Sequence, residues 1–188
     1  MKQLEKFNSL VEALESLPTI GKKSATRLAY HMLMHDSFSA VKIAHAIESA
    51  LGSIKKCVQC GGMSEDELCY ICSDERRNEK ILCIIESAKD ILMFEENGLF
   101  DGHYFVLEAL DALDISHLRN RVSTEVEEVV FAMTPSIAND AVILFIEDKL
   151  QDTNVRFSRI AQGVPTGVSL ENIDILSLSR ALEDRVKV

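Results

Sequence analysis

Four cysteines form two closely spaced pairs. Cys57 and Cys60 make one Cys-x-x-Cys pair, and Cys69 and Cys72 make a second pair after eight intervening residues. Two such pairs can place four thiolates at the corners of a tetrahedron, about 2.3 Å from one zinc ion. Disulfides need an oxidising compartment, and the first residues carry no apolar signal-peptide segment. The spacing therefore predicts one structural zinc ion per chain with all four cysteines as ligands.

The same spacing argues against redox or hydrolytic chemistry at these cysteines. A thioredoxin-like site usually has a single pair at the start of a helix. A shell of four sulfurs leaves no position for a water molecule, so the zinc is expected to be structural. The loop between the pairs has no apolar run, so the metal rather than packing is expected to order it. The fifth cysteine, Cys83, lies in an apolar run that reads as a buried strand.

A second group of functional candidates follows a short turn near the start of the chain. Apolar residues recur at helical spacing over residues 4–17 and again over 22–34, with a proline and a glycine between the two segments. This pattern is typical of a helix-hairpin-helix, in which backbone N–H groups at the start of the second helix bind a phosphate. An ordinary helix connection with a solvated basic face fits the pattern as well. The candidate DNA-binding residues are Lys22, Lys23 and Arg27.

The charge distribution favours a phosphate-binding surface in the first third of the chain. The net charge of the whole chain is -10, which argues against a nucleic-acid partner. Residues 1–56, however, hold eight Lys and Arg against five Asp and Glu, whereas residues 57–188 hold twelve against twenty-five. The acidic remainder is expected to repel DNA or to meet a basic partner.

Beyond a charged linker at residues 73–79, apolar strands alternate with helices. The strands are expected at 80–86, 103–107, 126–133 and 155–160, and the helices at 90–97, 115–121, 137–150 and 175–186. Before the linker, a third N-terminal helix is expected at 39–54. This alternation predicts an α/β sheet with right-handed crossovers. Ligands of such sheets lie beyond the carboxyl ends of the strands, where Glu86 and the segment from Met133 to Asp140 fall.

Composition narrows the function further. The chain has 188 residues, 47% hydrophobic and 27% charged, and no apolar run long enough to span a bilayer. We expect a cytoplasmic protein. Neither a Walker A loop nor a catalytic nucleophile pattern occurs. His31, His35 and His45 are expected to be packing or surface residues, because four cysteines already complete a zinc shell.

Four segments, in their order, resemble the bacterial recombination-mediator family RecR. They are residues 17–25 with Arg27-Leu28-Ala29, the four-cysteine module ending in Ile71-Cys72-Ser73-Asp74, Ile84-Ile85-Glu86, and residues 159–167. The resemblance covers essentially the whole chain. It implies a helix-hairpin-helix DNA-binding domain at 1–56, a four-cysteine zinc finger at 57–72, a Toprim-like α/β domain at 79–168 and a C-terminal helix at 169–188.

The resemblance also implies a function. RecR-like proteins are DNA-repair accessories without catalytic turnover that act with RecO and RecF to promote RecA loading on gapped or damaged DNA. They form dimers or tetramers shaped as rings, bind single- and double-stranded DNA without sequence specificity, and belong with the bacterial nucleoid. Two other functions stay open: a Toprim nuclease, and a zinc-stapled protein-interaction scaffold that does not touch DNA.

Several positions depart from the family pattern. Thr19 and Lys22 stand where a glycine and a proline are usual. A Toprim enzyme holds its magnesium with a glutamate and an Asp-x-Asp pair, and no Asp-x-Asp occurs between residues 126 and 150. The candidate Toprim acids are therefore Glu86 and Asp140 alone. The apolar stripe of the first helix either contacts another subunit or packs within its own domain.

Overall fold

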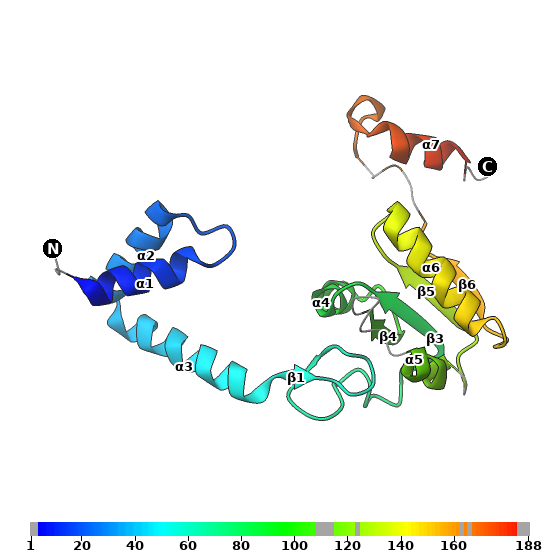
Figure 1. Cartoon of the computed structure of the whole chain (residues 1–188), viewed down its shortest axis with the longest axis horizontal. Coiled ribbons are helices and arrows are strands. Elements are labelled where there is room, and N and C mark those ends of the chain that lie inside the picture. The colour runs from blue at the N-terminus through cyan, green and yellow to red at the C-terminus, as the bar shows by residue number, and fades with distance from the viewer. Residues whose placement is uncertain (1–3, 108–114, 123–124, 162–163, 165–166, 184–188) are drawn as a thin grey trace. The chain divides into compact units, whose positions relative to one another are not determined.

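The computed structural model describes residues 4–107, 115–122, 125–161, 164 and 167–183, and the chain divides into two compact units at residue 54. The first unit contains three helices, α1 (Glu5–Glu15), α2 (Lys22–Met34) and α3 (Ser37–Ser53), drawn in blue and cyan in Figure 1. All three were predicted within two or three residues of their observed ends. The Asp36 side chain caps α3 by accepting a hydrogen bond from the Ser39 N–H at 2.9 Å.

The helices α1 and α2 pack against each other around Val11, Ala25 and Ala29. The two alanines are fully buried, and their small side chains allow a close approach of the helices. Half-buried residues complete this cluster: Phe7, Leu10, Leu14 and Ile20. The apolar stripe of α1 thus packs within its own unit, whereas α3 has no buried residue.

The second unit begins with a small hairpin that the sequence did not indicate. Its strands, β1 (Lys55–Lys56) and β2 (Met63–Ser64), are antiparallel and hold the first cysteine pair between them. Two-residue strands have no alternation of apolar and polar positions, which is the signal that sequence reading depends on. The hairpin therefore became visible only in the structure.

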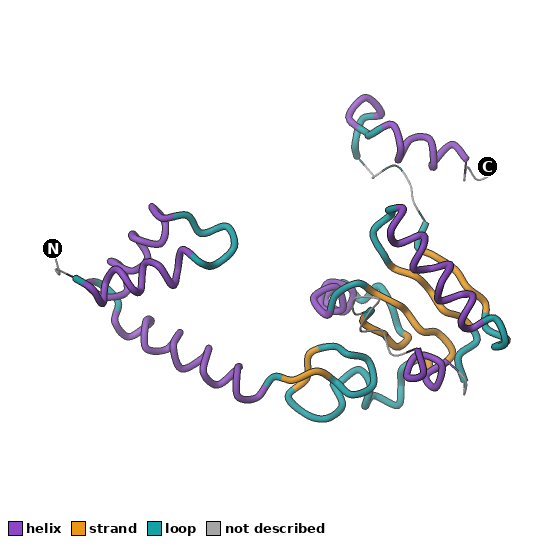
Figure 2. Tube along the Cα trace, in the orientation of Figure 1, coloured by secondary structure: helices purple, strands orange, loops and turns teal. Residues whose placement is uncertain are grey.

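A parallel sheet of four strands follows, in the order β4-β3-β5-β6. Its strands are β3 (Asn78–Ile85), β4 (Gly102–Val106), β5 (Glu128–Ala132) and β6 (Arg156–Arg159). The helices between them are α4 (Ala88–Glu96), α5 (Ile115–Val122) and α6 (Ile137–Leu150), and the 3-10 helix η1 (Leu170–Asn172) and α7 (Ile175–Glu183) come last. Figure 2 shows the strands in orange and the helices in purple. The predicted α/β fold is confirmed, and it is consistent with a Toprim-like domain.

Both faces of the sheet are covered, as the continuous apolar run of β3 requires. On one face, Leu82 and Ile84 join a core with residues of α5 and α6. On the other face, Cys83 and Ile85 join a core with α4 and three of the paired cysteines, Cys57, Cys60 and Cys69. The zinc module therefore replaces a helix as part of the cover on that face. Cys83 is 1% exposed, as predicted for a buried strand.

The strand order creates one switch point in the sheet. From β3 the chain crosses by α4 to β4 on one side, and from β5 it crosses by α6 to β6 on the other side. A crevice forms beyond the carboxyl ends of two neighbouring strands whose connections diverge in this way. Glu86 follows β3, and Thr134 follows β5, at that position. Among the described residues, no helix is both long and apolar enough to cross a membrane.

Candidate metal centre and nucleic-acid interface

The four paired cysteines converge on one point. One ligand atom from each of them lies within 4.8 Å of all the others. The sulfurs of Cys60 and Cys69 are 3.6 Å apart, close to the roughly 3.8 Å between two corners of a tetrahedron with 2.3 Å zinc–sulfur bonds. The backbone N–H of Gly62 donates to the Cys60 sulfur and that of Cys69 to the Cys57 sulfur, both at 3.3 Å. These hydrogen bonds stabilise thiolates, so the donor set fits a structural Zn²⁺.

Two glycines allow the first cysteine turn to close against the sheet. Gly61 has a φ of +74°, which an L side chain rarely adopts. A Cβ atom on Gly62 would lie 2.8 Å from Ile91 Cδ1 and 3.2 Å from the Cys60 sulfur. The Val106 N–H donates to the Cys60 carbonyl at 2.8 Å and so ties this turn to the end of β4. Packing against α4 and β4 therefore positions the first cysteine turn.

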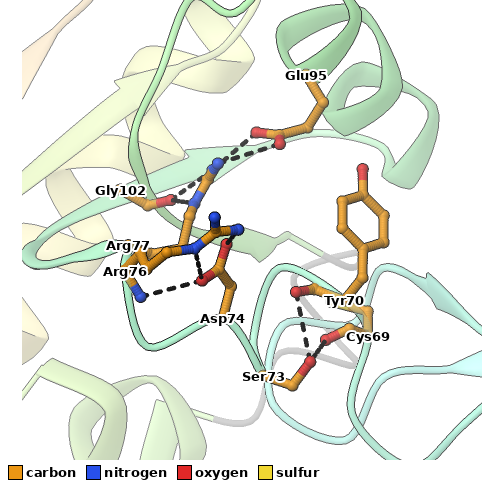
Figure 3. Close-up of polar contacts among 8 residues, drawn as sticks. All are labelled: Cys69, Tyr70, Ser73, Asp74, Arg76, Arg77, Glu95 and Gly102. Carbon is orange, nitrogen blue, oxygen red and sulfur yellow. Dashed lines mark hydrogen bonds and ion pairs between the residues drawn. The ribbon is translucent and has the colours of Figure 1, made fainter.

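The charged linker after Cys72 makes specific contacts with the sheet domain. Arg77 donates through Nη2 to Glu95 Oε1 at 2.7 Å and through Nε to the Gly102 carbonyl at 3.0 Å (Figure 3). The Tyr104 hydroxyl donates to the same Glu95 oxygen at 2.7 Å. Burial and this hydrogen bond raise the pKa of Tyr104, so the phenol stays protonated. Together these contacts join the segment that leaves the zinc module to α4 and β4.

Exposed cations lie at the start of α2, as the sequence predicted. Lys22, Lys23 and Arg27 are all exposed, and none of them forms an ion pair with an acid in the described part of the chain. Gly21 precedes the helix in an extended conformation, and no side chain caps the first turn. The free N–H groups at this helix end and its dipole favour an anion. The arrangement can therefore hold a phosphate.

The turn before α2 contains a strained residue. Thr19 has a φ of +69°, which is unfavourable for a β-branched side chain. A glycine at this position would adopt this φ value without strain. The Ile20 N–H donates to the Leu17 carbonyl at 3.2 Å and helps to hold the turn closed.

The two candidate Toprim acids have different partners. Glu86 accepts from the Thr134 N–H at 2.6 Å and from Asn139 Nδ2 at 2.9 Å. The Thr134 hydrogen bond is the main reason why the pKa of Glu86 lies below its usual value. Asp140 lies 3.6 Å from Arg159 in an exposed ion pair. Within the described residues, the one cluster of three or more metal-ligating side chains is the cysteine cluster.

Sequence reading missed Arg77 and Asn139. The partners of Arg77 lie 18 and 25 residues further on, and Asn139 reaches Glu86 across 53 residues. Neither residue belongs to a local pattern.

Comparisons with known proteins agree with this architecture. Three family models match: the RecR helix-hairpin-helix over residues 7–51, the RecR four-cysteine zinc finger over 54–74, and the RecR C-terminal segment over 163–186. The recombination protein RecR of a Nitratiruptor species is 56% identical over 99% of this chain and 98% of that protein.

Two further relatives are similar over nearly their full length. RecR of Campylobacter jejuni (serotype O:23/36, strain 81-176) is 52% identical, with 100% of both chains covered. RecR of Helicobacter pylori (strain Shi470) is 45% identical over 98% of this chain and 96% of that protein. The family resemblance noted from the sequence is confirmed, and the paired cysteines are those of the family's zinc finger. The chain belongs to the RecR family of recombination proteins.

Proposed function

We propose that this protein is a non-enzymatic DNA-binding mediator of recombinational repair, which acts with RecO-like and RecF-like proteins to promote RecA loading on gapped or damaged DNA. The observation that carries the proposal is the group of exposed cations at the uncapped start of α2. Lys23 and Arg27 are four residues apart and can contact neighbouring phosphates. In this proposal residues 1–56 contact DNA, and the zinc finger of residues 57–72 is structural.

The acidic remainder of the chain suits protein partners rather than DNA. Residues 57–188 carry thirteen more acidic than basic side chains. Such a surface repels a phosphate backbone and attracts a basic protein surface. We assign the Toprim-like domain, residues 79–168, to contacts with repair partners and residues 169–188 to a C-terminal helix. A role in the bacterial nucleoid follows from the DNA contact.

Two oxygens of Glu86 that a catalytic magnesium ion would need already accept hydrogen bonds from protein donors. The Thr134 N–H engages one oxygen, and the Asn139 amide engages the other. The other candidate acid, Asp140, is paired with Arg159, so magnesium would have to break this ion pair and share the Glu86 oxygens with their protein donors. This arrangement supports a domain that binds partners without transferring phosphoryl groups.

Self-association into a dimer or tetramer ring is the second part of the proposal. The helix α3 exposes Phe38, Val41, Ile47 and Leu51, each at least 55% accessible. With about 3.6 residues per turn these side chains lie on more than one side of α3, and a helix that is apolar on several sides is typically covered by protein. Several chains that present α2 together would bind DNA more tightly through effective concentration. Light scattering should show a species of at least two chains, and Leu51→Glu should shift it toward the monomer.

The DNA contact is tested with the double variant Lys23→Ala/Arg27→Ala in a salt series. Each lost phosphate contact should reduce the slope of log affinity against log salt by roughly 0.7 on single strands and 0.9 on duplex. The sequence of the DNA should not matter, because α2 offers no set of side chains that would read base edges. Lys42→Ala, which removes a cation from α3, is the matched control. Unchanged binding of the double variant at every salt concentration would contradict the proposed contact.

A further inference from the structure

Three rings meet at the exposed carboxyl end of α2. The Tyr30 and His35 ring centroids are 5.4 Å apart with an interplanar angle of 66°, and those of His31 and His35 are 5.9 Å apart at 31°. Tyr30 is 52% exposed, and both histidines are exposed as well. The rings thus support one another while their outer surfaces face solvent, an arrangement that core packing does not explain.

The ring cluster, defined as Tyr30, His31 and His35, continues the face that carries the cations. With 3.6 residues per turn, positions 23, 27, 30 and 31 fall on the outward half of α2, away from the buried Ala25 and Ala29. A rise of 1.5 Å per residue places Tyr30 about 4.5 Å beyond Arg27 along the helix axis. The same face therefore offers cations first and aromatic rings one turn later.

The charge of this face indicates the chemistry of the molecule that it binds. The sequence of α2, KKSATRLAYHMLM, contains no acidic residue. A cationic face interleaved with rings is suited to a polyanion that carries planar groups. A second copy of the same face would meet it with like charge, which disfavours a contact between copies at this surface.

We infer that the ring cluster stacks unpaired bases, so that α2 binds single-stranded DNA through phosphates at Lys23 and Arg27 and through bases at Tyr30. Bases in a duplex are stacked on one another and present only their edges, whereas an unpaired base exposes a face on which an aromatic side chain can stack. Every base has such a face, so stacking keeps the binding insensitive to sequence. This inference rests on the proposed DNA contact and adds to it a preference for single strands.

Three DNA probes of one length distinguish contacts with bases from contacts with phosphates. They are a single strand, a duplex and an abasic single strand. Tyr30→Ala should weaken binding of the single strand by about 5- to 100-fold, which corresponds to one stacked base. Affinity for the duplex and for the abasic strand should stay within about two-fold, and the salt slope should not change, since Tyr30 contacts no phosphate in this inference. Tyr70→Ala, at another exposed tyrosine, is the matched control and should alter none of these values.

A direct probe guards against a folding defect. The chain contains no tryptophan, so Tyr30→Trp introduces a single indole into the ring cluster beside His35. Its fluorescence should be quenched by the single strand and unaffected by the abasic strand. Quenching by both strands, or by neither, would overturn the stacking role.

The outcomes distinguish this inference from the proposal beneath it. If Lys23→Ala/Arg27→Ala weakens binding of all three probes while Tyr30→Ala affects them equally, the DNA contact stands and the stacking role is wrong. If the double variant changes the binding of no probe, the proposed DNA contact is wrong, and the stacking role that rests on it is overturned as well. If Tyr30→Ala lowers the oligomeric mass in light scattering and weakens all probes in parallel, the ring cluster is a contact between copies and the inference is overturned.

Discussion

Arg77 and Glu95 form a largely buried ion pair between two segments that are distant in the sequence. The Arg77 Nη2 and Glu95 Oε1 atoms are 2.7 Å apart, and the two side chains are 15% and 17% exposed. Glu95 also accepts from the Tyr104 hydroxyl, and Arg77 lies over the Tyr104 ring at 5.8 Å. The pair therefore connects the exit from the zinc finger with both a helix and a strand of the sheet.

Arg77→Ala should destabilise the second unit by roughly 2 to 4 kcal/mol, because it leaves the Glu95 carboxylate buried without its cation. Urea denaturation followed by circular dichroism measures this loss. The neighbouring Arg76 offers a matched control, since its side chain is 89% exposed and pairs with Asp74 at the surface. Arg76→Ala should change the free energy of unfolding by no more than about 0.5 kcal/mol. Equal effects of the two variants would show that the Arg77 pair has no special role.

The contrast between Arg77 and Arg76 also shows where sequence reasoning ends. Helices, strands and the cysteine cluster follow from local periodicity and spacing, and most of them were predicted to within a few residues. Arg76 and Arg77 have the same charge and adjacent positions, so nothing local separates the buried one from the exposed one. The difference depends on where Glu95 lies in the folded chain. The hydrogen bond of the Asn139 amide depends in the same way on where Glu86 lies. The ion pairs and hydrogen bonds that join distant segments were therefore the part that could not be predicted.

Thr19→Gly should stabilise the first unit. A β-branched residue at a φ of +69° is strained, and glycine relieves this at the cost of more freedom in the unfolded chain. We expect a net gain of about 0.5 to 1 kcal/mol in thermal or urea denaturation. Thr26→Gly, inside α2, should lose roughly 0.3 to 0.5 kcal/mol because glycine is a weaker helix former than threonine. A loss of stability at both positions would mean that Thr19 is not strained in solution.

We expect the zinc content of the protein to depend on the four paired cysteines and not on Cys83. Cys69→Ser should lower the zinc content below one ion per chain and destabilise the second unit, because the metal and the packing of the module are coupled. Cys83→Ala should keep one zinc ion, since Cys83 lies outside the metal cluster. Metal analysis of protein purified without chelator measures both.

Thiol labelling gives an independent check on the same site. Burial raises the pKa of the Cys83 thiol to about 12, so it should resist alkylation at pH 8 whether or not zinc is present. Removal of zinc by a chelator should expose four reactive thiols. Five reactive thiols in chelated, folded protein would show that Cys83 is not protected as described.

Asn139→Asp tests why Glu86 should hold no metal. The variant replaces the amide that donates to Glu86 at 2.9 Å with a second carboxylate. Two adjacent acids repel unless a cation lies between them, so magnesium should stabilise the variant in thermal denaturation and leave the parent unchanged. Plasmid nicking in the presence of magnesium should be absent for the parent protein. Reproducible cleavage that is lost in Glu86→Gln would instead support a Toprim nuclease.

His103 should make the stability of the second unit depend on pH. It lies on β4 with 5% exposure, and its Nδ1 atom has no hydrogen-bond partner among the described residues. Burial, and then the positive charges of Arg121 and Arg77, lower the pKa of His103 from its usual 6.5, and the nearby Glu79 opposes this only in part. The folded protein therefore resists protonation at a pH where the unfolded chain accepts a proton. Unfolding takes up a proton in this range, so the free energy of unfolding should fall as the pH drops below about 6.5 and be constant above it.

His103→Gln removes the titrating group and should flatten this part of the profile. The measurement is the difference in free energy of unfolding between parent and variant from pH 8 to pH 5.5. Protonation of the zinc ligands affects both proteins alike, so the difference isolates His103. His45→Gln is the control, because the side chain of His45 is 75% exposed and its removal should leave the profile unchanged. If the parent and His103→Gln lost stability in parallel below pH 6.5, the buried imidazole would not be the group responsible.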